Sequence, residues 1–252
     1  MKRIYFFVLP LIGIFLFSSC ENKIDIVSKL YAELDLAAAP NTLTDSEKQA
    51  GWLLLFDGET TDGWHGYNML GIPDVWDIED GCFTVNGEGG GEEQDVITDD
   101  IYRNFAFTVE YKLSVGSNSG IIFQVKEDPK YTYPYETGPE FQLIDHESWP
   151  DQLEDWQIHG ANYAMYPPKA KPYNPAGEWN RLFLVVNGNQ VTQMINGVEI
   201  VSYEKYSDEW VKLRNSGKWS EYPDYGIVDE GHISLQNHGT KLWFRNIKIK
   251  QL

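Results

Sequence analysis

The chain has 252 residues, of which 38 are acidic and 20 are basic, so its formal net charge at neutral pH is −18. A surface this acidic argues against nucleic acid and anionic lipid headgroups as partners, because both would be repelled. The only two cysteines, Cys20 and Cys82, are too few for a disulfide framework, and Cys82 is expected to be a small buried hydrophobe.

The first residues have the organisation of an export signal. A basic start of Lys2 and Arg3 is followed by an apolar run to Phe17, which is too short for a transmembrane helix. Two serines then precede Cys20, as in a lipobox. Residues 1–19 are therefore predicted to be a lipoprotein signal peptide, and the lipid at Cys20 would anchor an exported protein to a membrane, in the periplasm or at the cell surface. The alternative is an ordinary secretory signal in which Cys20 is incidental.

Residues 20–42 are predicted to be a tether. The stretch from Ile24 to Leu36 could form a short helix, but the alanines and the proline of residues 37–41 would end it. Thr44 and Glu47 have capping-box spacing, which predicts a brief helix over residues 45–50. Residues 43–252 are then one domain, long enough to bury its own core.

Beyond Gly51 the pattern changes to strands and turns. Residues 105–113 alternate cleanly, with an apolar row on one face and Glu110 on the other. Two Asn-Gly pairs, at 187–188 and 196–197, separate apolar runs and indicate hairpins. Further strands are predicted over residues 120–125, 140–145, 181–186, 190–195, 198–201, 232–236 and 242–249. Many short strands and little helical periodicity predict an all-β sandwich of two sheets, with long loops that could form the walls of a site.

One predicted strand carries two polar side chains beside each other. Phe141 and Leu143 would face the core, so Glu140 and Gln142 would stand together on the opposite face, with Asp145 at the strand's end. A carboxylate next to an amide suits the hydroxyls of a sugar, and the carboxylate can also take a proton. Four other polar side chains oppose the apolar residues of their own strands: Glu110, Ser234, Gln236 and His238.

If these strands are neighbours, their polar side chains form one acidic, amide-rich patch that would bind an oligosaccharide or glycoside. The alternative is an ordinary solvated sheet face, which every sandwich possesses. Loop aromatics bear on this choice, since the apolar faces of sugar rings stack on aromatic side chains. Trp76, Trp156 and Tyr163 are expected to line the site, out of a larger set that also contains Trp149, Tyr131, Tyr133, Tyr135 and Tyr166.

A metal site has weaker support in the sequence. The five histidines have neither the helical pairing nor the spacing of a zinc site. Acidic residues that follow Asp145 could bind calcium through oxygen atoms, but they lack the regular spacing of a calcium loop and are interpreted as a solvated loop. No cofactor or metal ligands are assigned, and participation of a divalent metal is left open.

Short motifs along the chain, taken in order, resemble the 3-keto-disaccharide hydrolase family. They cover nearly everything from Gly51 to Leu252 and lie at residues 51–58, 62–64, 76–81, 105–111, 118–120, 138–145, 177–180, 196–197, 235–239 and 244–247. The resemblance implies a concanavalin A-like jelly-roll β-sandwich whose concave sheet binds sugar. Gln124 departs from it, since many relatives carry arginine there, which puts a substrate contact at this position in doubt.

The resemblance also implies a hydrolase that acts on 3-keto-glycosides or oxidised disaccharides. A ketone at C3 acidifies the C2 hydrogen, so that a base can remove it, the C1 substituent can leave and water can add. Glu140 is the expected base with Asp145 second, and His238 is the expected acid or enolate donor. The expected substrate-binding residues are Glu110, Asn118, Gln142, Gln236, Trp76, Trp156, Tyr163 and Arg245, with a structural salt bridge as the alternative for Arg245.

Two other functions are left open by the sequence. The same fold hosts plain binding modules, so a non-catalytic glycan-binding lipoprotein is the main alternative. A retaining glucanase of the laminarinase type needs closely spaced acids, in the pattern E-x-D-x-x-E on one strand. Between Glu140 and Asp145, Gln142 stands where the middle acid belongs, which argues against a glucanase.

Overall fold

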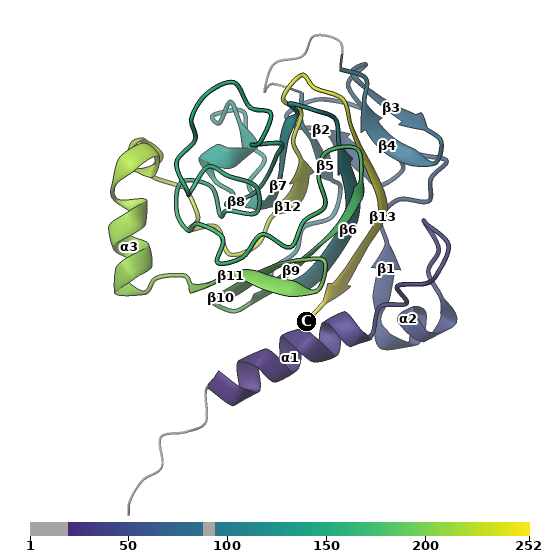
Figure 1. Cartoon of the computed structure of the whole chain (residues 1–252), viewed down its shortest axis with the longest axis horizontal. Helices are drawn as coiled ribbons and strands as arrows, with labels where there is room; N and C mark the ends of the chain where they lie inside the picture. Colours follow the sequence, from purple (N-terminus) through teal and green to yellow (C-terminus); the bar gives the residue numbers. More distant parts are fainter. Residues whose placement is uncertain (1–19, 88–93) are drawn as a thin grey trace, which may run out of the picture.

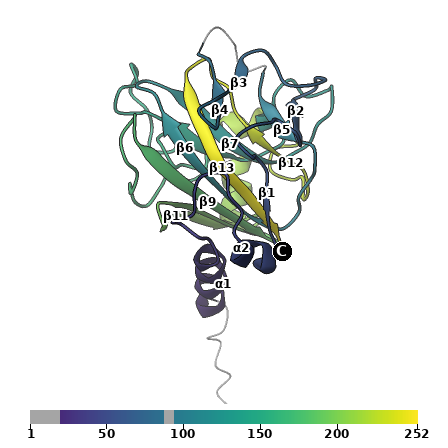
Figure 2. The same cartoon turned by 90° about the vertical axis from the view of Figure 1, so that its right-hand side faces the viewer.

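A computed structural model describes residues 20–87 and 94–252, so the predicted signal peptide at 1–19 lies outside the described residues. The described chain forms two antiparallel sheets that pack face to face (Figure 1 and Figure 2). The predicted all-β jelly-roll sandwich is therefore confirmed.

The larger sheet has eight strands within the described residues, and the smaller sheet has five. The larger sheet runs in the order β11 (Val198–Glu204), β10 (Gln190–Ile195), β9 (Trp179–Asn187), β6 (Phe105–Leu113), β13 (Leu242–Gln251), β4 (Cys82–Val85) and β3 (Trp76–Glu79), with β1 (Trp52–Leu54) beside β13. The smaller sheet runs in the order β2 (Trp64–Gly66), β5 (Val96–Thr98), β12 (His232–Leu235), β7 (Asn118–Val125) and β8 (Glu140–Ile144).

Every strand predicted from the sequence is present, with small shifts at the ends. The five short strands before β6 were not predicted, because so few residues show too little alternation.

The core lies between the two sheets and follows from strand alternation. The apolar row of β6 is buried there, and Phe141 and Leu143 of β8 join the same cluster from the smaller sheet. Burying a side chain of this size stabilises the fold by about 1.5–3 kcal/mol. Cys82 is also buried, as predicted, and burial raises the pKa of its thiol. Because alternate residues point opposite ways, Glu140 and Gln142 are directed to the outer face of the smaller sheet.

Three short helical segments and several long loops cover that outer face. They are η1 (Pro134–Glu136), α3 (Asp208–Arg214) and η2 (Gly217–Glu221). Figure 1 shows α3 and the loops that follow β8 on the same side of the sandwich. The smaller sheet is therefore covered rather than open to solvent.

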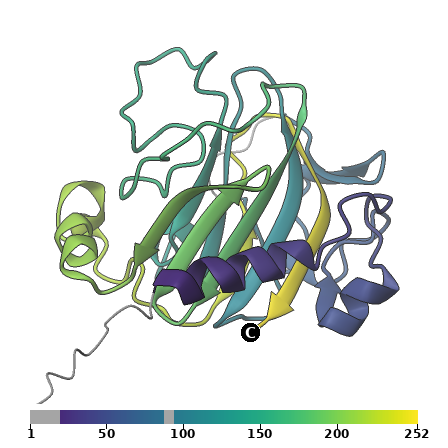
Figure 3. The ribbon, with the colours of Figure 1, turned by 60° about the horizontal axis from the view of Figure 1, so that its bottom comes forward.

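The N-terminal segment differs from the predicted tether. Helix α1 (Cys20–Ala32) lies across the outer face of the larger sheet, over β9 to β11 (Figure 3). Leu30 and Leu34 are buried there in a cluster with Phe183 and Val185 of β9. Because this contact removes apolar surface from water, the helix belongs to the folded domain instead of being a free tether. Within the described ranges, no helix is long and apolar enough to cross a membrane.

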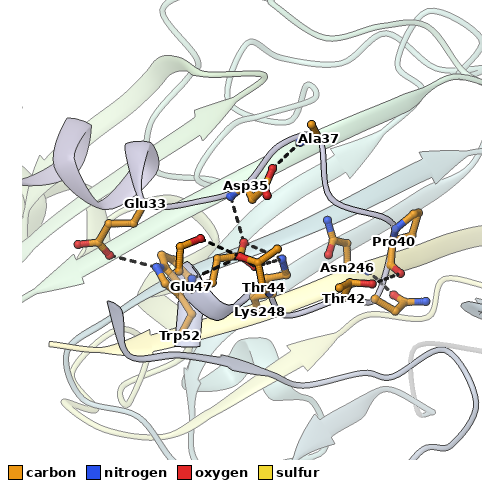
Figure 4. Close-up of polar contacts among 12 residues, drawn as sticks. Glu33, Asp35, Ala37, Pro40, Thr42, Thr44, Glu47, Trp52, Asn246 and Lys248 are labelled. Carbon is orange, nitrogen blue, oxygen red and sulfur yellow. Dashed lines mark hydrogen bonds and ion pairs between the residues drawn. The ribbon is translucent and has the colours of Figure 1, made fainter. Parts of the chain in front are cut away.

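A buried ion pair joins the predicted capping-box helix, α2 (Asp45–Ala50), to β13. Both carboxylate oxygens of Glu47 accept hydrogen bonds from Lys248 Nζ, at 2.7 and 2.8 Å, and the two residues are at most 1% exposed (Figure 4). The backbone amides of Thr44 and Asp35 also donate to Glu47, at 2.9 and 3.1 Å. Burial by itself raises the pKa of Glu47, but the hydrogen bonds from Lys248, Thr44 and Asp35 outweigh it and hold the pKa below its ordinary value.

Candidate functional site

A pocket of about 250 Å³ lies on the outer face of the smaller sheet. Its floor comes from the strands β7 and β8 and from the residues after β12: Asn118, Glu140, Gln142, Ile144, Gln236 and His238. Its walls come from η1, η2 and the long loop after β8: Tyr135, Trp149, Leu153, Gln157, Tyr163 and Lys218.

Six of the residues singled out from the sequence line this pocket. They are Asn118, Glu140, Gln142, Tyr163, Gln236 and His238. The exposed fractions of Glu140, Gln142 and Gln236 are only 3–4%, and Asn118 is 8% exposed. A solvated sheet face, the alternative interpretation of their shared parity, is therefore wrong for these side chains.

Gly120 on β7 makes room for the Glu140 carboxylate. Gly120 is paired with Gln142 across the two strands, and Ile122 is paired with Glu140. A Cβ atom at Gly120 would lie 2.6 Å from Glu140 Oε1 and 2.8 Å from Glu140 Cγ, closer than any side chain tolerates. The glycine of the Asn-Ser-Gly motif thus allows the carboxylate to lie against the sheet.

The loop after β8 returns along the edge of that strand and places Tyr163 beside Glu140. The Tyr163 amide donates to the Glu140 carbonyl at 3.0 Å. The Gln142 amide donates to the Ala161 carbonyl at 3.0 Å, and the Gly160 amide donates to the Gln142 carbonyl at 2.9 Å. These backbone contacts hold one wall of the pocket in a fixed register with its floor.

Three residues of the pocket lining carry an amide oxygen that lacks a hydrogen-bond partner among the described residues. The buried side-chain oxygens of Asn118, Gln142 and Gln236 have no hydrogen-bond partner within the part of the chain that the structure describes. A buried acceptor without a partner costs about 1–3 kcal/mol. Sugar hydroxyls donate hydrogen bonds, so a pocket whose lining residues carry amide oxygens without a partner in the described chain suits a polyhydroxylated ligand.

The buried His159 holds the end of β8. Its Nδ1 lies 3.0 Å from the carbonyl oxygen of Ile144, and its Nε2 lies 2.7 Å from the hydroxyl oxygen of Tyr111 in the core. A neutral imidazole satisfies both contacts. Burial lowers the pKa of His159 to about 3, so the ring stays neutral at physiological pH.

This pKa predicts a pH-dependent stability. The unfolded chain binds a proton on this histidine below about pH 6.5, whereas the folded chain does not until about pH 3, so stability falls as the pH falls through this window. The slope from one such group is at most about 1.4 kcal/mol per pH unit. In urea unfolding between pH 5 and pH 7, His159→Gln is expected to reduce the slope; equal slopes in the variant and the wild type would contradict the assignment.

Glu110 and Arg245 lie away from the pocket, contrary to expectation. Both belong to the larger sheet, where Glu110 accepts from Arg181 Nη2 at 2.5 Å and from Arg245 Nε at 2.8 Å. Arg245 therefore forms the structural salt bridge that was the alternative for it. The strand parity of Glu110 was correct, but its strand belongs to the opposite layer of the sandwich.

Three further candidates are also outside the pocket lining. Trp76 is 5% exposed and packs in the core against Phe83 and Phe244, so it cannot stack on a ligand. Trp156 is 38% exposed and packs edge-on against the lining residue Tyr163, with ring centroids 6.0 Å apart. Asp145 follows the last residue of β8, and its carboxylate accepts from the Gly116 amide at 2.8 Å.

Gln124 also lies away from the pocket lining. Its amide nitrogen donates to the Asp229 carbonyl at 2.7 Å, and its oxygen accepts from Lys205 Nζ at 3.0 Å. Lys205 is itself buried, which lowers its pKa to about 8. Glutamine in place of the arginine of many relatives thus affects the contact between β7 of the smaller sheet and Lys205, which follows β11 of the larger sheet. It does not change the pocket lining.

Sequence reasoning missed half of the pocket lining. Tyr135 and Trp149 belong to the larger set of loop aromatics, outside the three that are expected to line the site. Leu153 and Gln157 lie in an irregular loop and Lys218 lies in the short helix η2, so no periodicity indicates which of these side chains face inward. Among the described residues, no group of three or more histidine, cysteine, aspartate and glutamate side chains could hold a metal ion.

Comparisons with known proteins agree with the sandwich fold and show the family of this chain. Residues 51–250 match the sequence model of the 3-keto-alpha-glucoside-1,2-lyase-like domain. A 3-keto-disaccharide hydrolase of Bacteroides thetaiotaomicron is 32% identical in an alignment of 262 residues, gaps included. The alignment covers 92% of this chain and 89% of that protein. A crystal structure of a Parabacteroides distasonis protein assigned as a glycosyl hydrolase is 41% identical, with a TM-score of 0.80, over 85% of this chain and 100% of that one. A second protein from that species with the same assignment is 27% identical, with a TM-score of 0.62, over 80% and 99% of the two chains.

Proposed function

The chain belongs to the 3-keto-alpha-glucoside-1,2-lyase-like family, and from this membership and the pocket we propose that it is an enzyme that hydrolyses 3-keto-disaccharides. The relative from B. thetaiotaomicron carries that activity in its name and matches most of both chains. The buried amide oxygens on the pocket floor suit the hydroxyls of such a substrate.

One observation supports elimination over ordinary glycoside hydrolysis. Among the described residues that line the pocket, Glu140 is the one carboxylate. Ordinary retaining and inverting glycosidases need a second carboxylate, at about 5–10 Å from the first. A 3-keto sugar removes that need, because its ketone makes the C2 hydrogen acidic enough for a single base to abstract.

The reaction that we propose has three steps. The base takes the C2 proton, and the electron pair of the C2–H bond moves toward C3, so that an enolate forms with its charge on the C3 oxygen. The enolate then collapses and the C1–O bond breaks, while an acid protonates the departing sugar oxygen. Water finally adds to C1 of the enone and a proton returns to C2, so that the net change is the addition of one water molecule.

The pocket provides a group for each proton. Glu140 is the proposed base, since it is the lining carboxylate and Gly120 lets it lie against the floor. His238 lines the same pocket and is the proposed acid for the leaving oxygen. Asn118, Gln142 and Gln236 would orient the hydroxyls of the oxidised ring through their amide oxygens.

The size of the pocket bears on which part of the substrate enters it. Pockets for drug-sized ligands usually occupy roughly 300–1,000 Å³, whereas this one has about 250 Å³. It is therefore proposed to hold the oxidised ring alone, with the departing sugar at the mouth.

The direct test is incubation of the full chain with 3-keto-trehalose and, in parallel, with trehalose. Release of glucose from the oxidised sugar alone is the expected result, because only the ketone acidifies the C2 hydrogen. Equal cleavage of both sugars would indicate an ordinary glycosidase. Binding of the oxidised sugar without cleavage would instead support the glycan-binding module that was the alternative from the sequence.

We also propose that Cys20 carries a lipid that anchors the exported enzyme. Helix α1 begins at Cys20 and packs against the domain from Val27 onward, so about 10 Å of helix would separate the lipid from the packed part. Cys20→Ser is expected to abolish metabolic acyl labelling and to release the protein from membranes. The matched control, Cys82→Ser, should retain the acyl label and stay bound to membranes. Labelling that persists in Cys20→Ser would contradict the anchor.

A further inference from the structure

A cationic side chain enters the pocket from a segment that is distant in sequence from the strands. Lys218 lies in η2, which follows α3 in the connection between β11 and β12. Among the described residues that line the pocket, it is the one lysine or arginine. Its presence needs an explanation in a chain with a net charge of −18, because the sugar that the pocket is proposed to bind is neutral.

The ammonium group of Lys218 is held by three aromatic rings. Its Nζ lies 4.2 Å from the ring centroid of Tyr135, 4.8 Å from that of Tyr163 and 4.9 Å from that of Trp219. Each distance is within the range of a cation–π contact. The cage itself is fixed, because Trp219 is 1% exposed, stacks on Tyr225 with centroids 3.7 Å apart and donates through Nε1 to the Tyr163 carbonyl at 3.1 Å.

Tyr163 connects this cage to the proposed base. Its backbone amide donates to the Glu140 carbonyl, and its ring belongs to both the cage and the pocket wall. The cation and the carboxylate are therefore placed around one small space of about 250 Å³, each on its own rigid support. Groups fixed in this way need no rearrangement when charge develops between them.

We propose that Lys218 is a catalytic residue that stabilises the enolate oxygen at C3, an inference that rests on the proposed function. When the base removes the C2 proton, the carboxylate becomes neutral and its negative charge is transferred to the C3 oxygen of the substrate. A cation at the pocket wall interacts weakly with the neutral ketone and strongly with the enolate. The contact therefore favours the transition state over the bound substrate, which raises kcat and leaves KM nearly unchanged.

The test compares Lys218→Met and Lys218→Arg with the wild type on 3-keto-trehalose. Methionine retains an apolar side chain of similar length over the rings but removes the charge, and kcat is expected to fall by about 10²–10³-fold with KM changed by less than about threefold. Arginine keeps the charge, so kcat of Lys218→Arg is expected to be at least about tenfold higher than that of Lys218→Met. Lys212→Met on α3 is the matched control, since Lys212 is exposed and outside the pocket lining, and it should behave as the wild type.

Two outcomes separate this inference from the function on which it rests. If the wild type cleaves the oxidised sugar and Lys218→Met keeps its kcat, or raises KM alone, Lys218 does not stabilise the enolate and only this inference is overturned. If the wild type does not cleave the oxidised sugar, both the proposed function and the inference are overturned. Thermal unfolding of each variant shows whether a lower rate reflects loss of the aromatic cage instead of loss of charge.

Discussion

Replacement of Glu140 by glutamine is expected to lower kcat on a 3-keto-disaccharide by about 10²–10⁴-fold, which is the usual contribution of a general base. Glutamine has the same shape but cannot accept the C2 proton. Substrate binding should change little, because Asn118, Gln142 and Gln236 keep their amide oxygens on the pocket floor. Initial rates of sugar release, with KM measured in the same series, provide the test.

Glu110→Gln is the matched control for this substitution. Glu110 is another carboxylate that the sequence assigned to the site, but it lies on the larger sheet with Arg181 and Arg245. Its replacement should lower the melting temperature and leave kcat within about twofold of the wild type. Near-normal turnover by Glu140→Gln would remove Glu140 from the role of base, and a large loss in Glu110→Gln would place the active site elsewhere.

Gly120→Ala moves the carboxylate without changing it. The new Cβ atom would lie 2.6 Å from Glu140 Oε1, so the Glu140 side chain must shift. A displacement of about 1 Å in a reacting group can cost about 10²-fold in rate. A variant that stays folded and is slowed to this extent would show that the position of the carboxylate, and not only its charge, determines turnover.

The largest expected effect on stability is that of Lys248→Met. This change leaves the Glu47 carboxylate buried without its cation, and breaking a buried ion pair on one side costs about 3–5 kcal/mol. Replacing both partners by apolar residues, in Glu47→Leu with Lys248→Met, should cost less than the single change, because no charge is then left buried. Urea unfolding monitored by tryptophan fluorescence would measure the three free energies.

Lys250→Met provides the comparison on the same strand. Lys250 Nζ lies 2.6 Å from Glu33 Oε2, but these side chains are 18% and 31% exposed, so their pair should contribute less than about 1 kcal/mol. The pH dependence gives a second check, because the folded-state pKa of Glu47 is lowered. Its stabilisation is fully present above the unfolded-state pKa and is lost as the pH falls through the folded-state pKa. Equal losses in Lys248→Met and Lys250→Met would contradict this account of the ion pair.

The regular parts of the fold could be predicted because alternation is a local property. Residues 105–113 and 190–195 have the predicted strand bounds, and the capping box correctly gave α2 over Asp45–Ala50. The packing of α1 was not predictable in the same way. Its amphipathic face is short, and its partners Phe183 and Val185 lie about 150 residues later in the chain.

The candidate site was predictable only as far as strand parity and strand order agree. Parity placed Glu140 and Gln236 opposite their apolar neighbours, and their strands lie together in the smaller sheet, so they share a pocket. Parity placed Glu110 equally well, but it cannot say which layer a strand joins. Lys218 gave no signal at all, since its position depends on how an irregular connection folds over the sheet.

The measurement that tests the central claim most directly follows deuterium at C2 of the substrate. A 3-keto-disaccharide labelled with deuterium at C2 is cleaved in ordinary water under single-turnover conditions, and the product is analysed by mass spectrometry beside labelled product incubated without enzyme. Abstraction by Glu140 predicts that the wild type releases the label to solvent beyond that background. If the product loses no more deuterium than the control without enzyme, the C1–O bond breaks without removal of the C2 hydrogen, which contradicts the mechanism.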